Sequence, residues 1–124
     1  MYKLAVKEDF IAQHFLIGGD WGAENQKHSH HYGLEIQVEG ETLDNHGYLV
    51  DIVKLRKSLE ELISRYRGRT LNELSEFKDI NPSIENLARI SCQAARASVG
   101  DSGISVIKVK VWEDEIACVT YKED

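Results

Sequence analysis

The feature that most restricts what this chain can fold into is a run of alternating side chains between residues 28 and 38. Alternation with a period of two is typical of a β-strand that is buried on one face, because successive side chains point to opposite sides. The side that carries the apolar residues also carries two imidazoles, and its members are His28, His30, Tyr32, Leu34, Ile36 and Val38. This predicted strand therefore places a His-x-His pair at one end of an apolar face.

The segment Phe10-Ile11-Ala12-Gln13-His14 repeats this arrangement, with Phe10 and Ala12 on the same side as His14. If the two strands pair, three histidines converge. Three neutral imidazoles with an open fourth position are the ligand set of a catalytic zinc ion, which polarises an oxygen or activates water. Histidines at strand ends also serve simply as caps and hydrogen-bonding groups, and the spacing alone leaves that alternative open.

Length and composition restrict the class of protein. A chain of 124 residues predicts one domain spanning residues 1–124. A net charge of -6 offers no basic stripe for phosphates, which argues against a nucleic-acid partner. No apolar run approaches the roughly 20 residues of a membrane-spanning helix, and no signal-peptide pattern is present. With two cysteines outside any motif spacing, Cys92 and Cys118, these features predict a reduced, cytoplasmic setting.

Two strands and two helices are expected in the first hundred residues. Residues 3–17 and 28–39 have strand-like patterns joined by a Gly-rich connection, and a helical period follows over 51–66. A second helix is expected to begin near Asn81-Pro82, with Asn81 as its cap, and to stop at Gly100. Its predicted buried stripe consists of Ile84, Leu87, Ala88, Ser91, Ala94 and Ala95.

A hairpin is expected to close the chain, with a turn at 114–115 and a return strand over 116–121. One face of its first strand carries Ile107, Val109, Val111 and Glu113. The order strand, strand, helix, helix, strand, strand predicts an α+β fold: a four-stranded antiparallel sheet with both helices on one face. Because a small open sheet has two unpaired edges, assembly of several copies edge to edge into a β-barrel is expected.

Several motifs together resemble the 6-pyruvoyltetrahydropterin synthase and 6-carboxytetrahydropterin synthase family, and the resemblance covers nearly the whole chain. Its most specific parts are the three histidines and Asn81-Pro82-Ser83-x-Glu85-Asn86, which is similar to the family's Asn-Pro-Thr-x-Glu-Asn. Further matches lie at 47–51, 54–55 and 71–72. The resemblance implies the tunnelling fold, in which trimers stack into hexamers with sites at subunit interfaces.

The resemblance also implies the residues of a site for Zn²⁺ and a pterin. A glutamate at position 113 would accept two parallel hydrogen bonds from the N–H groups of the ring, and burying it unpaired would be costly. The alternative is that this glutamate only begins an acidic turn with residues 114–115. By resemblance, zinc would be held by His14, His28 and His30, and the substrate by Glu113 and Ser83.

The chain departs from the family at two catalytic positions. Where the family has a catalytic cysteine, shortly before the His-x-His pair, this chain has Glu24, and Arg67-Gly68 replace an Asp-His pair. Family members with glutamate in that place are associated with cleaving the dihydroneopterin side chain to 6-hydroxymethyl-dihydropterin. Such a retro-aldol step needs a Lewis acid and a base for the hydroxyl proton, so Glu24 is the candidate base. The alternative for Glu24 is a solvated loop residue.

Three hypotheses about function follow from these patterns. The leading one is a zinc-dependent lyase of the pterin pathway that acts on 7,8-dihydroneopterin or its phosphates. The second is another zinc-assisted elimination on a pterin or related bicycle, with a base from a neighbouring subunit. The third is a non-catalytic pterin- or purine-binding module that has kept the pocket and the metal.

Overall fold

The computed structural model describes residues 1–100 and 103–124. One antiparallel sheet has the order β1-β2-β3-β4, which confirms the expected topology. The longer elements are β1 (Tyr2–His14), β2 (His28–Gly40), α1 (Ile52–Tyr66), α2 (Ile84–Val99), β3 (Val106–Glu113) and β4 (Ala117–Glu123). Three short 3-10 helices are η1 (Gly22–Asn25), η2 (Leu71–Glu73) and η3 (Ser75–Phe77).

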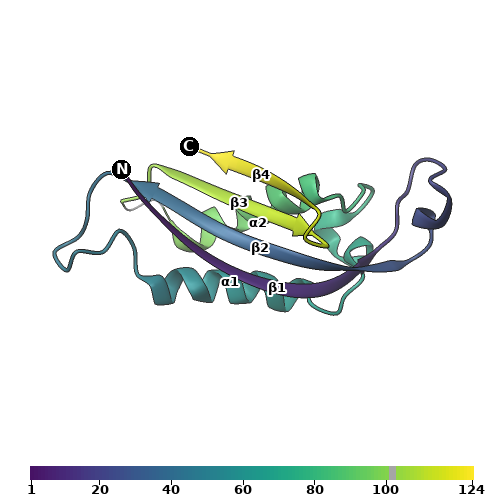
Figure 1. Cartoon of the computed structure of the whole chain (residues 1–124), viewed down its shortest axis with the longest axis horizontal. Coiled ribbons are helices and arrows are strands. Elements are labelled where there is room, and N and C mark those ends of the chain that lie inside the picture. Colours follow the sequence, from purple (N-terminus) through teal and green to yellow (C-terminus); the bar gives the residue numbers. More distant parts are fainter. Residues whose placement is uncertain (101–102) are drawn as a thin grey trace.

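Both helices lie along the same face of the curved sheet (Figure 1). Helix α1 packs mainly on β1, helix α2 packs on β3 and β4, and the two helices contact each other. The face of β2 that the alternation predicted to be buried is indeed fully covered at Tyr32, Leu34, Ile36 and Val38. This face forms the core and continues to the end of the sheet where the histidines lie.

Strand β1 ends at His14, three residues earlier than expected. Phe15 and Ile17 leave the ladder because side-chain amides replace the partner strand. The amide of Asn72 accepts from the Phe15 N–H at 3.0 Å and donates to its carbonyl at 2.9 Å. Asn81 makes the same pair of hydrogen bonds with Ile17, at 2.7 and 3.2 Å. These two amides therefore hold the segment that follows β1.

Helix α2 begins later than expected because Asn81 is already used in this way. The cap is Ser83, whose hydroxyl accepts from the Asn86 N–H at 3.1 Å. The predicted stripe is buried except at Ile84, which is half-buried and packs against the core, and at Ala94, which is exposed. Gly100 ends the helix with φ of 83°, as expected. Two further members complete the buried stripe, Cys92 and Val99.

The hairpin also differs slightly from its prediction. Glu113 pairs with Ala117, so the connecting loop covers residues 114–116 and the return strand starts one residue later than expected. Ile116 lies in this loop, where its N–H donates to the Glu113 carbonyl at 3.1 Å, and it is 89% exposed. Among the residues that the structure describes, no helix combines the length and apolar character needed to cross a membrane.

Candidate metal centre and substrate site

The pairing of β1 with β2 brings the three predicted metal ligands together. His14 lies directly opposite His28, and His30 lies opposite Ala12, two residues further along the same face. The ring centroids are 4.5 Å apart for His14 and His28, 4.8 Å for His14 and His30, and 4.9 Å for His28 and His30. One ring nitrogen of each residue lies within 4.8 Å of the other two. The cluster thus has the size of a single ion site.

His14 is the buried member of the cluster and is held by two neighbours. Its Nδ1 lies 3.0 Å from the carbonyl oxygen of Pro82 and 3.2 Å from the Tyr32 hydroxyl. Burial lowers the pKa of the His14 imidazole, although the hydrogen bond to Pro82 acts against this effect. A neutral imidazole that donates from Nδ1 offers the lone pair of Nε2, which is the form that binds a metal.

The other two histidines are oriented in the same way. His28 Nδ1 lies 2.7 Å from the carbonyl oxygen of Gln26, and His30 Nδ1 contacts the carboxylate of Asp114. Because all three Nδ1 atoms make hydrogen bonds, the lone pairs of the three Nε2 atoms remain available to bind a metal ion. The Nε2 atom of His28 is buried and has no hydrogen-bond partner among the described residues. A buried nitrogen without a partner is costly in a protein interior, so this arrangement fits a bound cation such as zinc.

Glu113 stands beside this cluster at the end of β3. It pairs with Tyr32 of β2, and its carboxylate Oε1 lies 3.4 Å from His30 Nε2. The side chain is 28% exposed, so it is neither fully solvated nor sealed in the core. Burial raises the pKa of the Glu113 carboxyl, and the nearby Glu24 carboxylate acts in the same direction. This position leaves the Glu113 carboxylate accessible to solvent at the end of the apolar face.

Glu24 lies in η1, in the connection between β1 and β2, and its side chain is exposed. Its backbone carbonyl accepts from the Leu16 N–H at 2.9 Å, and the Asn25 amide donates to the carbonyls of Leu16 and Gly19, both at 3.0 Å. These bonds fold the connection back onto the segment after β1. The Glu24 carboxylate lies near enough to raise the pKa of His14, in opposition to the larger effect of burial.

Neither cysteine belongs to this cluster. Cys92 is buried under β3, with its sulfur 3.8 Å from the carbonyl oxygen of Ile107. That contact is six residues along β3 from Glu113, or about 20 Å. Cys118 pairs with Trp112, so alternation points it to the face opposite the one that carries Glu113. Burial raises the pKa of the Cys92 thiol to about 11, which keeps it protonated.

The Arg67-Gly68 segment runs beside the outer edge of β1. The Gly68 N–H donates to the Ile11 carbonyl at 2.7 Å, and the Gln13 N–H donates to the Arg69 carbonyl at 2.9 Å. The Arg67 guanidinium lies 3.9 Å from the Glu8 carboxylate. These residues therefore pair with the outer edge of β1 near its end.

Two supporting residues were missed by sequence reasoning, which named Tyr32 only as a core residue and Asp114 only as a turn residue. For Asp114 the sequence shows only an acid directly after a candidate substrate carboxylate, which places it near the site but does not predict its contact with His30. No feature of the sequence indicated that the carbonyl of Pro82 would contact His14. Ser83 is explained by its cap of α2, and its role toward a substrate stays a prediction.

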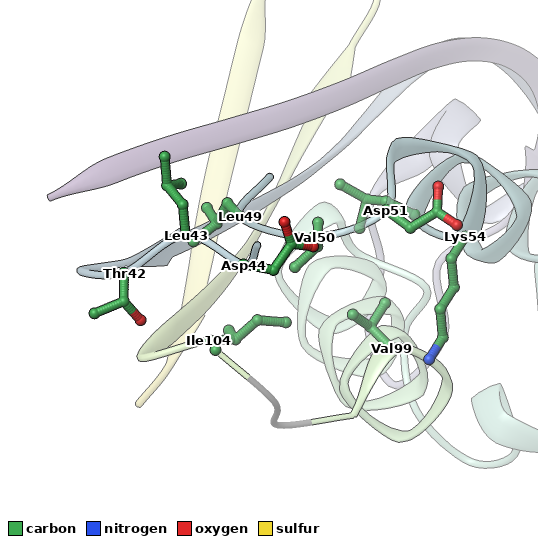
Figure 2. Close-up of a pocket in the computed structure, with 11 residues that line it drawn as sticks. Thr42, Leu43, Asp44, Leu49, Val50, Asp51, Lys54, Val99 and Ile104 are labelled. Carbon is green, nitrogen blue, oxygen red and sulfur yellow. The ribbon is translucent and has the colours of Figure 1, made fainter. Parts of the chain in front are cut away.

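A cavity of about 490 Å³ lies elsewhere, beyond the opposite end of β2 (Figure 2). The loop before α1 and the end of α2 form its walls, and it contains none of the predicted site residues. Its charged groups are of both signs: Asp44, Asp51 and Lys54. The histidine cluster instead lies at an open end of the sheet.

Comparison with known proteins identifies the fold and the family. A family profile described as 6-pyruvoyl tetrahydropterin synthase matches residues 3–124. A Pyrococcus furiosus protein named dihydroneopterin monophosphate aldolase is 28% identical over 112 residues, which is 90% of this chain and 89% of that protein. The 6-pyruvoyl tetrahydrobiopterin synthase of Dictyostelium discoideum is 26% identical over 130 residues, 96% of this chain and 94% of that protein.

Among solved structures, the 6-pyruvoyl tetrahydropterin synthase of Caenorhabditis elegans matches with a TM-score of 0.83 and 23% identity, over 99% of this chain and 96% of that one. The predicted tunnelling fold of the subunit is thereby confirmed. Because the family profile spans nearly the whole sequence, this chain belongs to the 6-pyruvoyl tetrahydropterin synthase family of pterin-pathway enzymes.

Proposed function

We propose that this chain is a zinc-dependent lyase that cleaves the side chain of 7,8-dihydroneopterin, or of one of its phosphates, to give 6-hydroxymethyl-dihydropterin. The observation that carries the proposal is the convergence of three histidines beside the Glu113 carboxylate, with Glu24 in the adjoining connection and no cysteine in the cluster among the described residues. The name of the Pyrococcus furiosus relative supports dihydroneopterin monophosphate as a substrate to test.

His14, His28 and His30 would hold the zinc ion through their Nε2 atoms. When bound, zinc would supply Lewis-acid chemistry at an oxygen of the substrate side chain. The hydrogen bonds to the three Nδ1 atoms keep each ring in the required tautomer and orientation. The donor set of three imidazoles is one that zinc prefers in catalytic sites.

Glu113 would bind the pterin ring. An ionised carboxylate accepts two parallel hydrogen bonds, which matches the adjacent ring N–H and amino groups of an aminopyrimidinone. Its place next to His30, with 3.4 Å between Oε1 and Nε2, supports a pose in which the ring would lie beside the metal and its side chain would point toward the cluster. Partial burial strengthens such hydrogen bonds, because fewer water molecules compete for them.

Glu24 would act as the base. It takes the proton from the hydroxyl of the second side-chain carbon, and the bond between the first and second carbons breaks to release a two-carbon aldehyde or its phosphate. The electron pair of that bond enters the conjugated ring imine, and the first carbon is then reprotonated by the proton that Glu24 carries. The step needs no oxidant, and every atom of the substrate is accounted for in the two products.

Turnover by wild type and Glu24→Gln tests this proposal, with Glu61→Gln on the exposed side of α1 as the matched control. Dihydroneopterin, its monophosphate, its triphosphate and a six-carbonyl pterin are assayed by fluorescence and mass spectrometry. We expect Glu24→Gln to retain zinc and ring affinity but to lose about 100-fold or more in kcat, the usual contribution of a positioned proton acceptor. Glu61→Gln should match wild type.

Two results would contradict the proposal in different ways. Equal rates for wild type and Glu24→Gln would make Glu24 a bystander, and the base would then have to come from another residue or subunit. A wild-type protein that binds zinc and a pterin but converts none of the four compounds would favour the binding-module hypothesis instead.

A further inference from the structure

The turn that follows β3 has an unusual backbone. Asp114 and Glu115 have φ values of 53° and 59°, a region that residues other than glycine rarely adopt. Aspartate tolerates this region better than most residues, because its short side chain can hydrogen-bond to nearby backbone. Two such residues in succession, with the Ile116 N–H donating to the Glu113 carbonyl at 3.1 Å, form the tight turn that is common in β-hairpins.

Asp114 makes three hydrogen bonds to consecutive residues of β2. Its N–H donates to the carbonyl of His31 at 2.7 Å, and its Oδ1 accepts from the His31 N–H at 3.0 Å. Its Oδ2 lies 2.5 Å from Nδ1 of His30. The backbone bond holds the Asp114 main chain beside β2, and the bond from the His31 N–H to Oδ1 restrains the carboxylate that contacts the His30 ring.

The group that contacts Nδ1 of His30 is charged, whereas the groups that contact Nδ1 of the other two histidines are neutral. His14 and His28 face backbone carbonyls through Nδ1, whereas His30 faces a carboxylate. A carboxylate at this nitrogen fixes the tautomer and makes the opposite nitrogen a stronger metal ligand. The same turn also carries Glu113, the residue before Asp114, at 3.4 Å from the Nε2 of His30.

We propose that Asp114 is a positioning residue that holds His30 as a metal ligand and locks it in register with Glu113. The inference rests on the proposed zinc centre and deepens it. One turn would thereby set the spacing between the metal and the carboxylate that binds the ring. In this role the Asp114 carboxylate would act through the His30 ring and not as a catalytic residue.

The test is zinc affinity, measured by competition with a chromophoric chelator, in wild type, Asp114→Asn and Asp114→Gly. Asparagine keeps the size of the side chain and removes its charge, and glycine accepts the positive φ without strain, so at least one variant retains the turn. The matched control is Glu115→Gln, the exposed neighbour in the same turn. We expect zinc to bind 10- to 100-fold more weakly to both Asp114 variants and unchanged to the control.

Two further measurements separate positioning from a general loss of structure. The melting temperature of each metal-free variant should stay close to that of the wild type, and the visible spectrum of the cobalt-substituted protein should change only in the Asp114 variants. Zinc affinities within threefold of wild type would overturn the inference while leaving the zinc centre in place. Failure of the wild type to bind zinc would overturn both.

Discussion

The stability of this protein should depend on zinc through His28. Its Nε2 is buried without a partner among the described residues, so a bound ion would stabilise the folded state and not the unfolded chain. At free zinc 100 times above the dissociation constant, linkage predicts about 2.7 kcal/mol of stabilisation. A chain of this length has an unfolding entropy of roughly 0.26 kcal/mol per kelvin, so the melting temperature should rise by about 10 °C.

His28→Ala should remove most of this rise. Without metal, the variant loses the hydrogen bond to Gln26 and some ring contacts but also removes a buried nitrogen without a partner, so its melting temperature should lie within about 4 °C, or 1 kcal/mol, of the wild type. The control is His46→Ala, because His46 is exposed in the loop at the other end of the sheet. Thermal unfolding is followed for all three proteins with chelator and with zinc. An equal zinc-dependent rise in wild type and His28→Ala, or no rise in wild type, would refute the reasoning.

Two other substitutions test the roles of Glu113 and Ser83. Glu113→Gln should weaken the binding of a pterin ring by roughly 2 to 4 kcal/mol, because the amide N–H₂ group that replaces one carboxylate oxygen cannot accept a hydrogen bond from the ligand N–H. Unchanged titration curves would show that Glu113 is only a turn residue. Ser83→Ala should cost about 1 kcal/mol of stability through the lost helix cap, measured by denaturant unfolding, and leave pterin affinity unchanged if capping is its whole role.

The regular part of the site was predictable because it follows from strand periodicity. Antiparallel pairing of neighbouring strands brings the end of β1 beside the start of β2, where the histidines lie, and the observed register sets His14 opposite His28. The inward placement of Glu113 followed from the same rule applied to β3. Helix α1 was expected over 51–66, and the structure uses Asp51 as its cap, with the carboxylate accepting from the Val53 N–H at 2.9 Å.

The irregular parts were not predictable, since side chains there compete with the backbone for hydrogen bonds. Asn81 was expected to cap α2, and instead its amide pairs with Ile17, which leaves the cap to Ser83. Both residues are good helix caps, so local propensity does not distinguish them. The contact of Asp114 with His30 depends on a turn with two positive φ values at residues other than glycine, a conformation that the pattern of the sequence does not announce.

The segments that follow β1 and α1 also decide how much sheet edge remains for assembly. Hydrogen bonds from Gly68 and to Arg69 occupy the outer edge of β1 at Ile11 and Gln13, within the same chain. An edge that is already paired cannot accept a strand from a second copy. The expected barrel would therefore use only the earlier part of β1, before Ile11, and would leave the histidine end of the sheet beyond the paired region. A substrate site at the histidines would then stay open within a single chain, because the Glu24 side chain is exposed and that of Glu113 is half-buried.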